Sequence, residues 1–543
     1  MRVVIIGGVA GGMSAATRLR RLDESAEIIV LERSGHVSYA NCGLPYYVGG
    51  VISDENKLYL QTPDSLHKRF RLDVRVNHEV IDISSEKKAV IVRDLLSAQK
   101  SEIHFDKLIL SPGATPIVPP IAGIERALTL RTVEDVLRIY EAVEVKPKSA
   151  VVIGGGFIGV EMAENLVHKG IKTSLIEALP QVLAPLDPEM AELVHQELRK
   201  NGIDLHLANS VKEITSEEVI LSDGSKVSAE LVIASIGVKP DITLARAAGV
   251  EIGSKGGISV NGFNQTSNPD IYAIGDVAEK NDDLTGESTL IPLANIANRH
   301  GRITADHIAG KAVREVASVG TAIVKVFDLA VATTGWNAKK LRALGREFTE
   351  IHTHPNSHAT YYPGATQFSL KLIFDPKSGE IFGAQGVGRD GVDKRIDVIS
   401  TALRAGITAP ELADLELAYA PPFGSAKDPV NMLGYIADNI VSKSTEIAQW
   451  SEINKFIADG YALVDVRSPS EYANGTIPGS INIPVDELRE RHLEINNKKV
   501  IVNCQVGQRG HVATMLLRSL GYDAKNLDGG YLTWINSPAG NIK

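Results

Sequence analysis

Cysteine is scarce in this chain, with Cys42 and Cys504 the only two among 543 residues. A disulfide framework is therefore excluded, and a reducing compartment fits the composition. Aromatic residues reach only 5%, and no run approaches the ~18 to 20 apolar residues of a membrane span. The balance of 57 basic against 66 acidic residues gives a net charge of −9. This charge argues against a nucleic-acid surface, although a local basic patch could still meet an anionic cofactor.

Hydrophobic residues make up 44% of the chain and charged residues 23%, which is typical of globular proteins with ample core. At roughly 150 residues per domain, the length predicts three or four domains. The apolar run at the N-terminus is too short for a secretory signal, and basic residues follow it rather than precede it. We therefore expect a cytoplasmic protein.

The first glycine-rich motif is GGVAGG at residues 7–12. The apolar strand 3–6 precedes it, a helix from about residue 13 to 22 follows, and strand 27–31 then ends at Glu32. In a dinucleotide-binding βαβ unit, the helix N-terminus faces a pyrophosphate and the acid accepts a ribose hydroxyl. Val9 stands where the second glycine of G-x-G-x-x-G belongs, so this motif alone leaves a simple strand–turn–helix open.

The second motif, GGGFIG at residues 154–159, is intact. It lies between strand 150–153 and a helix through Leu166, and strand 173–176 ends at Glu177. All parts of a dinucleotide site therefore occur in order. Glu177 would accept both ribose hydroxyls and repel a 2′-phosphate, and no Arg or Lys follows it closely, which favours NADH over NADPH.

Three further segments each have the pattern of an apolar strand that enters a tight turn. They are FDKLILSPGA at 105–114, LVIASIG at 231–237 and TSNPDIYAIGD at 266–276. Each alone is more often a simple turn. Together with two nested nucleotide units, they resemble the disulfide-oxidoreductase flavoprotein family over residues 1–440. The resemblance implies that the first unit binds FAD, with Asp276 on its ribityl chain, and that the second binds the nicotinamide cofactor. The cofactor-binding residues it implies are Gly7, Gly8, Ala10, Gly11, Gly12, Glu32, Arg33, Asn41, Ser111, Gly113, Gly154, Gly156, Gly159, Glu177, Gly237, Asp276 and Pro292.

The segment SYANCGLPY at 38–46 follows the first unit and carries Cys42. A thiolate beside a flavin can open an S–S bond, whereas a lone cysteine is otherwise more often structural. Tyr47 stands where glutathione-reductase-like members of the family carry a second cysteine, which excludes an internal dithiol. The resting form of Cys42 is therefore a mixed disulfide with an external thiol or a sulfenic acid.

Single-cysteine oxidases and peroxidases of the family carry a histidine in the first glycine turn, where this chain has Ala10. The segments GGVAGG, SYANCGLPYY, SHATYYPGA at 357–365 and LAYAPPFGSAKDP at 417–429 instead resemble coenzyme A disulfide reductases. That resemblance implies a mixed disulfide of Cys42 with coenzyme A and a homodimer in which the partner's Tyr361, or the adjacent Tyr362, and Tyr419 assist catalysis. The alternative for this tyrosine cluster is packing at an interface. Predicted coenzyme A contacts are Arg18, Arg21, Ser38, Asn41, Thr62, Tyr362 and Lys427.

A new pattern begins near residue 451, with LVDVR at 463–467, CQVGQRG at 504–510 and LDGG at 527–530. A cysteine after a buried strand, in a glycine-containing turn into a helix, receives backbone N–H groups that stabilise a thiolate or a persulfide. Arg509, at the C-x-x-x-x-R spacing, would hold an anionic donor such as a thiosulfate-like or polysulfide group. The same spacing occurs in phosphatases, but the flanking segments resemble the rhodanese family over about 90 residues. A silent rhodanese fold is the alternative, and the retained Cys504 argues against it.

The expected fold is α/β: two nested Rossmann-like domains for FAD and NAD, an α+β dimerisation domain and a C-terminal α/β rhodanese domain. The predicted bounds are 1–117 with 242–318 for FAD, 118–241 for NAD(H), 319–442 for dimerisation, 443–450 for a linker and 451–543 for the rhodanese domain. The predicted activity is FAD-dependent reduction, by NADH, of coenzyme A disulfide, coenzyme A persulfide or polysulfide through Cys42, with Cys504 delivering sulfane sulfur. No metal site is predicted.

Two alternatives remain open at this point. One is an NADH oxidase or peroxidase cycling through a sulfenic acid on Cys42. The other is a sulfur-carrier or redox-sensing module that acts on a partner protein. The choice among sulfur substrates, and whether sulfur passes directly from Cys504 to Cys42, also stay open.

Overall fold

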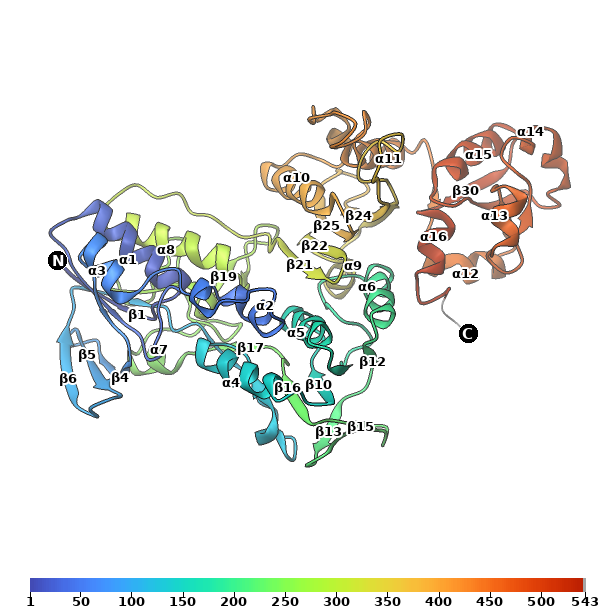
Figure 1. The fold of residues 1–543 in the computed structure, drawn as a ribbon. Helices are drawn as coiled ribbons and strands as arrows, with labels where there is room; N and C mark the ends of the chain where they lie inside the picture. Colours follow the sequence, from blue (N-terminus) through green and yellow to red (C-terminus); the bar gives the residue numbers. More distant parts are fainter. Residues whose placement is uncertain (541–543) are drawn as a thin grey trace. The chain divides into compact units, whose positions relative to one another are not determined.

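The computed structural model describes residues 1–540, which form two compact units (Figure 1). The first unit comprises Met1–Pro180 and Gly202–Ser318. The second comprises Gln181–Asn201 and the chain from Val319 onward. Among these described residues, no helix has both the length and the apolar character needed to cross a bilayer.

The first unit contains a five-stranded parallel sheet in the order β18-β7-β1-β2-β3. Its central strands are almost fully buried runs of Val, Ile and Leu, as expected for a parallel sheet covered on both faces. Helix α1 (Ala10–Leu22) packs along α8 (Ala294–Ile308). The strands are β1 Arg2–Ile6, β2 Glu27–Leu31, β3 Asp73–Arg75, β7 Lys107–Leu110 and β18 Ile271–Ala273.

A second parallel sheet of the first unit has the order β12-β11-β10-β16-β9, and helix α5 (Phe157–His168) follows its central strand. The two sheets thus repeat one strand–turn–helix arrangement. A two-stranded antiparallel link, β8 (Ala114–Pro116) with β17 (Val238–Pro240), carries the chain between them. The strands of this sheet are β9 Leu128–Thr129, β10 Ser149–Ile153, β11 Lys172–Ile176, β12 Asp204–His206 and β16 Leu231–Ala234.

Smaller elements complete the first unit. Two three-stranded antiparallel sheets have the orders β4-β5-β6 and β13-β14-β15, and β19 pairs with β20. These elements are α2 Leu44–Val48, α3 Pro63–Phe70, β4 His78–Ser84, β5 Ala89–Asp94, β6 Lys100–His104, α4 Val133–Glu144, β13 Val211–Ile214, β14 Glu218–Leu221, β15 Lys226–Ser228, α7 Thr243–Ala247, β19 Lys280–Asn281 and β20 Ser288–Thr289.

The second unit begins with a five-stranded antiparallel sheet in the order β21-β22-β25-β24-β23. Helices α10 (Val392–Ala405) and α11 (Pro429–Val441) share a hydrophobic core with it. The remaining elements of this part are α6 Pro188–Lys200, β21 Ala322–Val326, β22 Leu329–Gly335, α9 Ala338–Ala343, β23 Thr349–Thr353, β24 Phe368–Phe374 and β25 Ile381–Gly388.

The C-terminal part of the second unit is a parallel sheet in the order β26-β30-β29-β27-β28. Helix α15 (Gln508–Ser519) follows β29 (Lys499–Asn503), and α16 (Gly530–Ile535) follows β30 (Asp523–Leu527). The other elements are β26 Ile447–Ala448, α12 Ile453–Ala458, β27 Ala462–Asp465, α13 Pro469–Ala473, β28 Ile481–Asn482 and α14 Leu488–Arg491.

The expected α/β class is confirmed, with the parallel sheets, the α+β sheet and the C-terminal domain in the predicted order. Two details differ from the sequence analysis. The segment predicted as a linker, 443–450, contains β26, which pairs with β30. Helix α6, predicted within the NAD(H) domain, belongs to the second compact unit. The domain bounds themselves stay a prediction.

Candidate active site

The first glycine turn is built from very close backbone contacts. Gly7 has φ +99°, and a Cβ there would lie 2.0 Å from the carbonyl oxygen of Ser111. A Cβ on Gly12 would lie 1.9 Å from the Gly7 oxygen. Only glycine fits these positions, so the first turn of α1 packs tightly against β1 although Val9 replaces the middle glycine of the motif.

The second turn repeats this geometry. Gly154 has φ +105° and its Cβ would lie 2.4 Å from the Ser235 oxygen, while a Cβ on Gly159 would lie 1.8 Å from the Gly154 oxygen. In contrast, a Cβ on Gly156 would meet nothing within 4 Å. The tight turn therefore opens onto free space at the point where a pyrophosphate approaches the backbone in dinucleotide-binding folds, and the residues present fit such a group.

An acidic residue at the end of the next strand faces each glycine turn. Glu32 Oε2 accepts a hydrogen bond of 2.8 Å from the Gly8 N–H. Glu177 Oε2 accepts one of 2.6 Å from the Gly155 N–H. Both carboxylates lie at the carboxyl edge of their sheet, where an acid can accept ribose hydroxyls.

Cys42 lies in the 3₁₀ turn Asn41–Gly43, ahead of α2, and is exposed. Partial desolvation by the surrounding protein raises the pKa of its thiol, and the Glu161 carboxylate raises it further, whereas Arg131 acts in the opposite direction. Glu161 accepts a hydrogen bond of 3.1 Å from the Tyr46 hydroxyl. Burial raises the pKa of Glu161 to about 7, so this carboxyl can exchange a proton near neutral pH beside the thiol.

Glu161 and Arg131 were not identified from the sequence. Glu161 stands two residues after Gly159 on the otherwise apolar start of α5, and that lone acid is the signal that could have found it. Arg131 Nη2 donates a hydrogen bond of 2.6 Å to Asp276 Oδ2. This pair joins residues 145 positions apart, and nothing local in the sequence indicates it. Asp276, the predicted ribityl contact, thus has a charged partner in the free chain.

We expect the substitution Glu161→Gln to lower the pKa of Cys42, because above pH 7 the ionised carboxylate opposes the thiolate. Iodoacetamide alkylation of Cys42 against pH, in a Cys504→Ser background, measures this shift. The matched control is Glu141→Gln, an exposed acid on α4, which should leave the midpoint in place. An unchanged midpoint in the Glu161 variant would show that the two groups do not interact.

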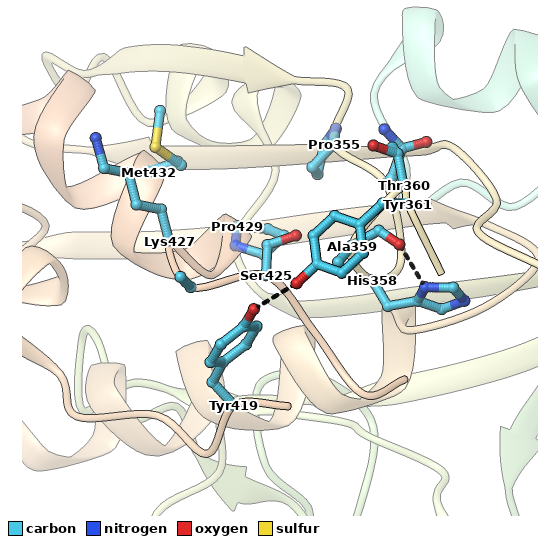
Figure 2. Close-up of a pocket in the computed structure, with 12 residues that line it drawn as sticks. Pro355, His358, Ala359, Thr360, Tyr361, Tyr419, Ser425, Lys427, Pro429 and Met432 are labelled. Carbon is cyan, nitrogen blue, oxygen red and sulfur yellow. Dashed lines mark hydrogen bonds between the residues drawn. The ribbon is translucent and has the colours of Figure 1, made fainter. Parts of the chain in front are cut away.

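In the second unit, the predicted tyrosines come together at a pocket of about 300 Å³ (Figure 2). The Tyr361 and Tyr419 hydroxyls share a hydrogen bond of 2.9 Å, which raises the pKa of Tyr361. Their side chains are 74% and 48% exposed, so both hydroxyls are open to a further molecule. Lys427 lines the same pocket. Tyr362 instead meets the His358 ring edge-on, with 5.7 Å between ring centroids.

Several predicted coenzyme A contacts already have partners in the chain. Arg18 forms an ion pair of 2.6 Å with Asp306, and the Thr62 hydroxyl accepts from the Ser65 N–H at the start of α3. Arg21 is exposed, while Ser38 and Asn41 are partly buried near Cys42 in sequence. These positions stay predictions. So do the remaining cofactor contacts, which lie in loops or at the start of α1: Ala10, Gly11, Arg33, Gly113, Gly237 and Pro292.

Cys504 is buried directly after β29. The Gly507 N–H donates a hydrogen bond of 3.2 Å to its Sγ, and Gly507 has φ +94° at the start of α15. The Tyr531 N–H donates to the Cys504 carbonyl at 2.7 Å. The loop therefore aims one backbone N–H at the sulfur, and the turn Asp528–Tyr531, which leads into α16, supports the loop.

That supporting turn is anchored to the antiparallel domain. His352, on β23, donates its backbone N–H to Asp528 Oδ1 at 3.0 Å, and its Nδ1 lies 2.6 Å from Asp528 Oδ2. His354 Nε2 lies 2.7 Å from the Thr533 hydroxyl oxygen. Although burial opposes ionisation, Asp528 and Glu189 raise the pKa of His352 to about 9. His352 is therefore cationic at neutral pH and fixes the turn Asp528–Tyr531.

A buried ionic cluster lies behind His352. The ammonium of Lys371 lies 2.9 Å from Asp187, 2.5 Å from Glu189 and 2.6 Å from Glu350. The three carboxylates are close enough to hold a metal ion, but Lys371 already supplies the compensating charge. The cluster joins α6, β23 and β24, and no sequence motif indicates it.

Two parallel sheets each carry a glycine turn that faces an acidic residue, and the isolated thiol of Cys42 follows the first of them. These features define the class of redox flavoproteins. The Cys504 loop adds a fold of the sulfurtransferase class. A sequence profile described as pyridine nucleotide-disulphide oxidoreductase matches residues 1–301, and its dimerisation domain matches 321–429. A rhodanese-like domain matches residues 449–537. The chain belongs to the pyridine nucleotide-disulphide oxidoreductase family and carries a C-terminal rhodanese domain.

Individual relatives agree with this assignment. Coenzyme A disulfide reductase of Staphylococcus aureus is 34% identical over 440 residues, which cover 80% of this chain and 99% of the relative. The crystal structure of reduced CoADR-RHD from Bacillus anthracis is 49% identical, with a TM-score of 0.97 and 98% of each chain covered. A NAD-dependent persulfide reductase from A. fulgidus is 36% identical, with a TM-score of 0.93, and the match covers 98% of this chain and 100% of that one.

Proposed function

We propose that this protein is a FAD-dependent reductase that uses NADH to reduce coenzyme A disulfide, coenzyme A persulfide or polysulfide through Cys42. The observation that carries the proposal is the isolated, exposed Cys42 beside a protonatable Glu161 in a two-nucleotide fold. The names of the relatives support the sulfur substrates. Bound flavin would supply the electrons that open an S–S bond at Cys42.

The preference for NADH follows from Glu177. Its two oxygens accept from the Gly155 and Leu179 N–H groups, so the carboxylate is held at the edge where a ribose binds. A 2′-phosphate would meet this negative charge. Ala178 and Leu179 follow it and offer no cation.

The tyrosine pair would serve a second subunit. Because Tyr361 and Tyr419 are exposed and hydrogen-bonded to each other, they can pass a proton to a thiolate that leaves Cys42. The dimerisation domain supports a homodimer, and the proposal places the partner's tyrosine pair at Cys42. Lys427, at the same pocket, could bind a coenzyme A phosphate.

The intact mass of freshly isolated, unreduced protein, with peptide mapping of Cys42, tests the proposal. A coenzyme A adduct on Cys42 that dithiothreitol removes is expected. An oxygen adduct, or a bare thiol that gains oxygen from peroxide while NADH is consumed, would instead identify an oxidase or peroxidase that cycles through a sulfenic acid.

We expect Tyr419→Phe to lower kcat for coenzyme A disulfide by about 100-fold, the lower end of the usual contribution of a positioned proton donor. KM should change little, since the ring remains. Tyr435→Phe, an exposed tyrosine on α11, is the control and should keep full activity. Equal rates in both variants would remove Tyr419 from the proton transfer.

A further inference from the structure

The arginine of the Cys504 loop is already engaged by a carboxylate. Arg509 Nη1 donates to Glu471 Oε2 at 2.8 Å and Nη2 donates to Oε1 at 2.6 Å. This two-point pairing is the strongest geometry available to an arginine and a carboxylate. The Arg509 hydrogen bonds lower the pKa of Glu471 to about 2, so the pair stays ionised at neutral pH and its charges sum to zero.

Two other basic side chains near the loop, Arg467 and His511, also provide no spare positive charge. Arg467 is buried, donates to both oxygens of Asp465, and also donates to the Gln505 side chain at 3.1 Å. Burial lowers the pKa of His511 and favours its neutral form. Between Cys504 and Arg509 the loop reads Gln-Val-Gly-Gln and contains no Lys or Arg. Arg509 also acts on Cys504, through a side-chain hydrogen bond and through its charge, but Glu471 offsets that positive charge. Among these described residues, the sulfur therefore meets the Gly507 N–H and no unneutralised side-chain cation.

We propose that Cys504 takes its sulfur from donors whose reacting end carries at most one negative charge, organic persulfides and hydropolysulfides, and that Glu471 sets this preference against thiosulfate by neutralising Arg509. Thiosulfate carries two negative charges and would approach a thiolate with no spare cation to offset the repulsion. The inference rests on the proposed function, to which it adds the role that the sequence predicts for Cys504, the loading of sulfane sulfur.

The transfer step balances without any added oxidant. The Cys504 thiolate attacks the terminal sulfur of R–S–SH, and a new S–S bond forms to Cys504. The donor S–S bond breaks, and its electron pair leaves on R–S⁻, while the proton remains on the protein persulfide. The Gly507 N–H, which already faces Sγ at 3.2 Å, stabilises the anionic sulfur during this exchange.

The test measures loading of Cys504 in the full-length, FAD-loaded chain with Cys42→Ser, so that only one cysteine reacts. Samples are quenched after mixing with thiosulfate or glutathione persulfide, and the intact mass gives the rate of persulfide formation. We expect thiosulfate to load at least about tenfold more slowly at equal concentration. Glu471→Gln should raise the thiosulfate rate by about tenfold, as one freed charge-assisted hydrogen bond would give, and leave the glutathione persulfide rate within about twofold.

The glutamine variant is chosen because it preserves the fold around it. Glu471 also accepts from the Ser468 N–H in the capping box of α13, and glutamine maintains such a box. Glu494→Gln removes a similar two-point pair with Arg491 in the same domain and should alter neither rate.

Equal loading of wild-type Cys504 from both donors, or a Glu471→Gln variant with an unchanged ratio of the two rates, would overturn the inference. The assay contains no NADH and no reactive Cys42. Its failure would therefore leave reduction through Cys42 intact, while failure of the proposed function would appear only in NADH oxidation.

Discussion

Replacing Cys42 with serine should lower NADH-dependent reduction of coenzyme A disulfide by at least about a thousandfold, because a hydroxyl cannot form the mixed disulfide that splits the reaction into two steps. The chain has no second thiol near it in sequence to take over, since Tyr47 stands at the partner position. The measurement is NADH oxidation at 340 nm under anaerobic conditions, with flavin content matched between the variants.

Cys504→Ser is the matched control for this substitution. It removes the other free cysteine, and we expect it to retain reduction of coenzyme A disulfide and of small persulfides while impairing sulfide release from polysulfide. A Cys42→Ser variant that still reduces coenzyme A disulfide at near the wild-type rate would refute the proposed function. Equal loss of both sulfur substrates in Cys504→Ser would exclude a sulfur relay.

Lys371→Met should lower the free energy of unfolding of the second unit by about 3 to 5 kcal/mol, the cost of leaving buried carboxylates without their cation. Lys371 is fully buried and touches Asp187, Glu189 and Glu350. Methionine fills a similar volume but supplies no charge. A urea titration followed by circular dichroism and by tryptophan emission measures the midpoint of the transition.

Lys377→Met is the control, because Lys377 is exposed and pairs with the exposed Glu347 at the surface. Pairs exposed to solvent in this way contribute little to stability, so the midpoint should barely move. If the two methionine variants unfold at the same urea concentration, the buried cluster does not hold the second unit together.

The parts of the protein that follow local rules could be predicted from the sequence. The turns at Gly7 and Gly154 require a positive φ and a close approach of the backbone. The glycines of the two motifs indicate both requirements in the sequence. The acids Glu32 and Glu177 were identified because each ends a short apolar strand. The Cys504 loop was recognisable because its cysteine, glycine and arginine lie within six residues.

The parts that were missed depend on residues far apart in the chain. The side chain of Arg131 pairs with Asp276, and Lys371 pairs with Glu189 of α6 and Glu350 of β23. Only tertiary packing creates these contacts. The strand at residues 447–448 was also not foreseen, because two residues are too few for a strand pattern and their pairing with β30 depends on tertiary packing. The predicted free role of Arg509 likewise ignored Glu471, which is 38 residues away.

Because His352 contacts Asp528, the rhodanese domain cannot be exchanged or removed without a change in the antiparallel domain. A chain cut after residue 442 would leave His352 and Glu189 without the carboxylate that completes their pairing. The excised C-terminal piece, in turn, would carry Asp528 unpaired beside the turn that supports Cys504. A domain exchange between homologues must therefore replace both sides of this contact together, β23 and the segment Asp528–Thr533.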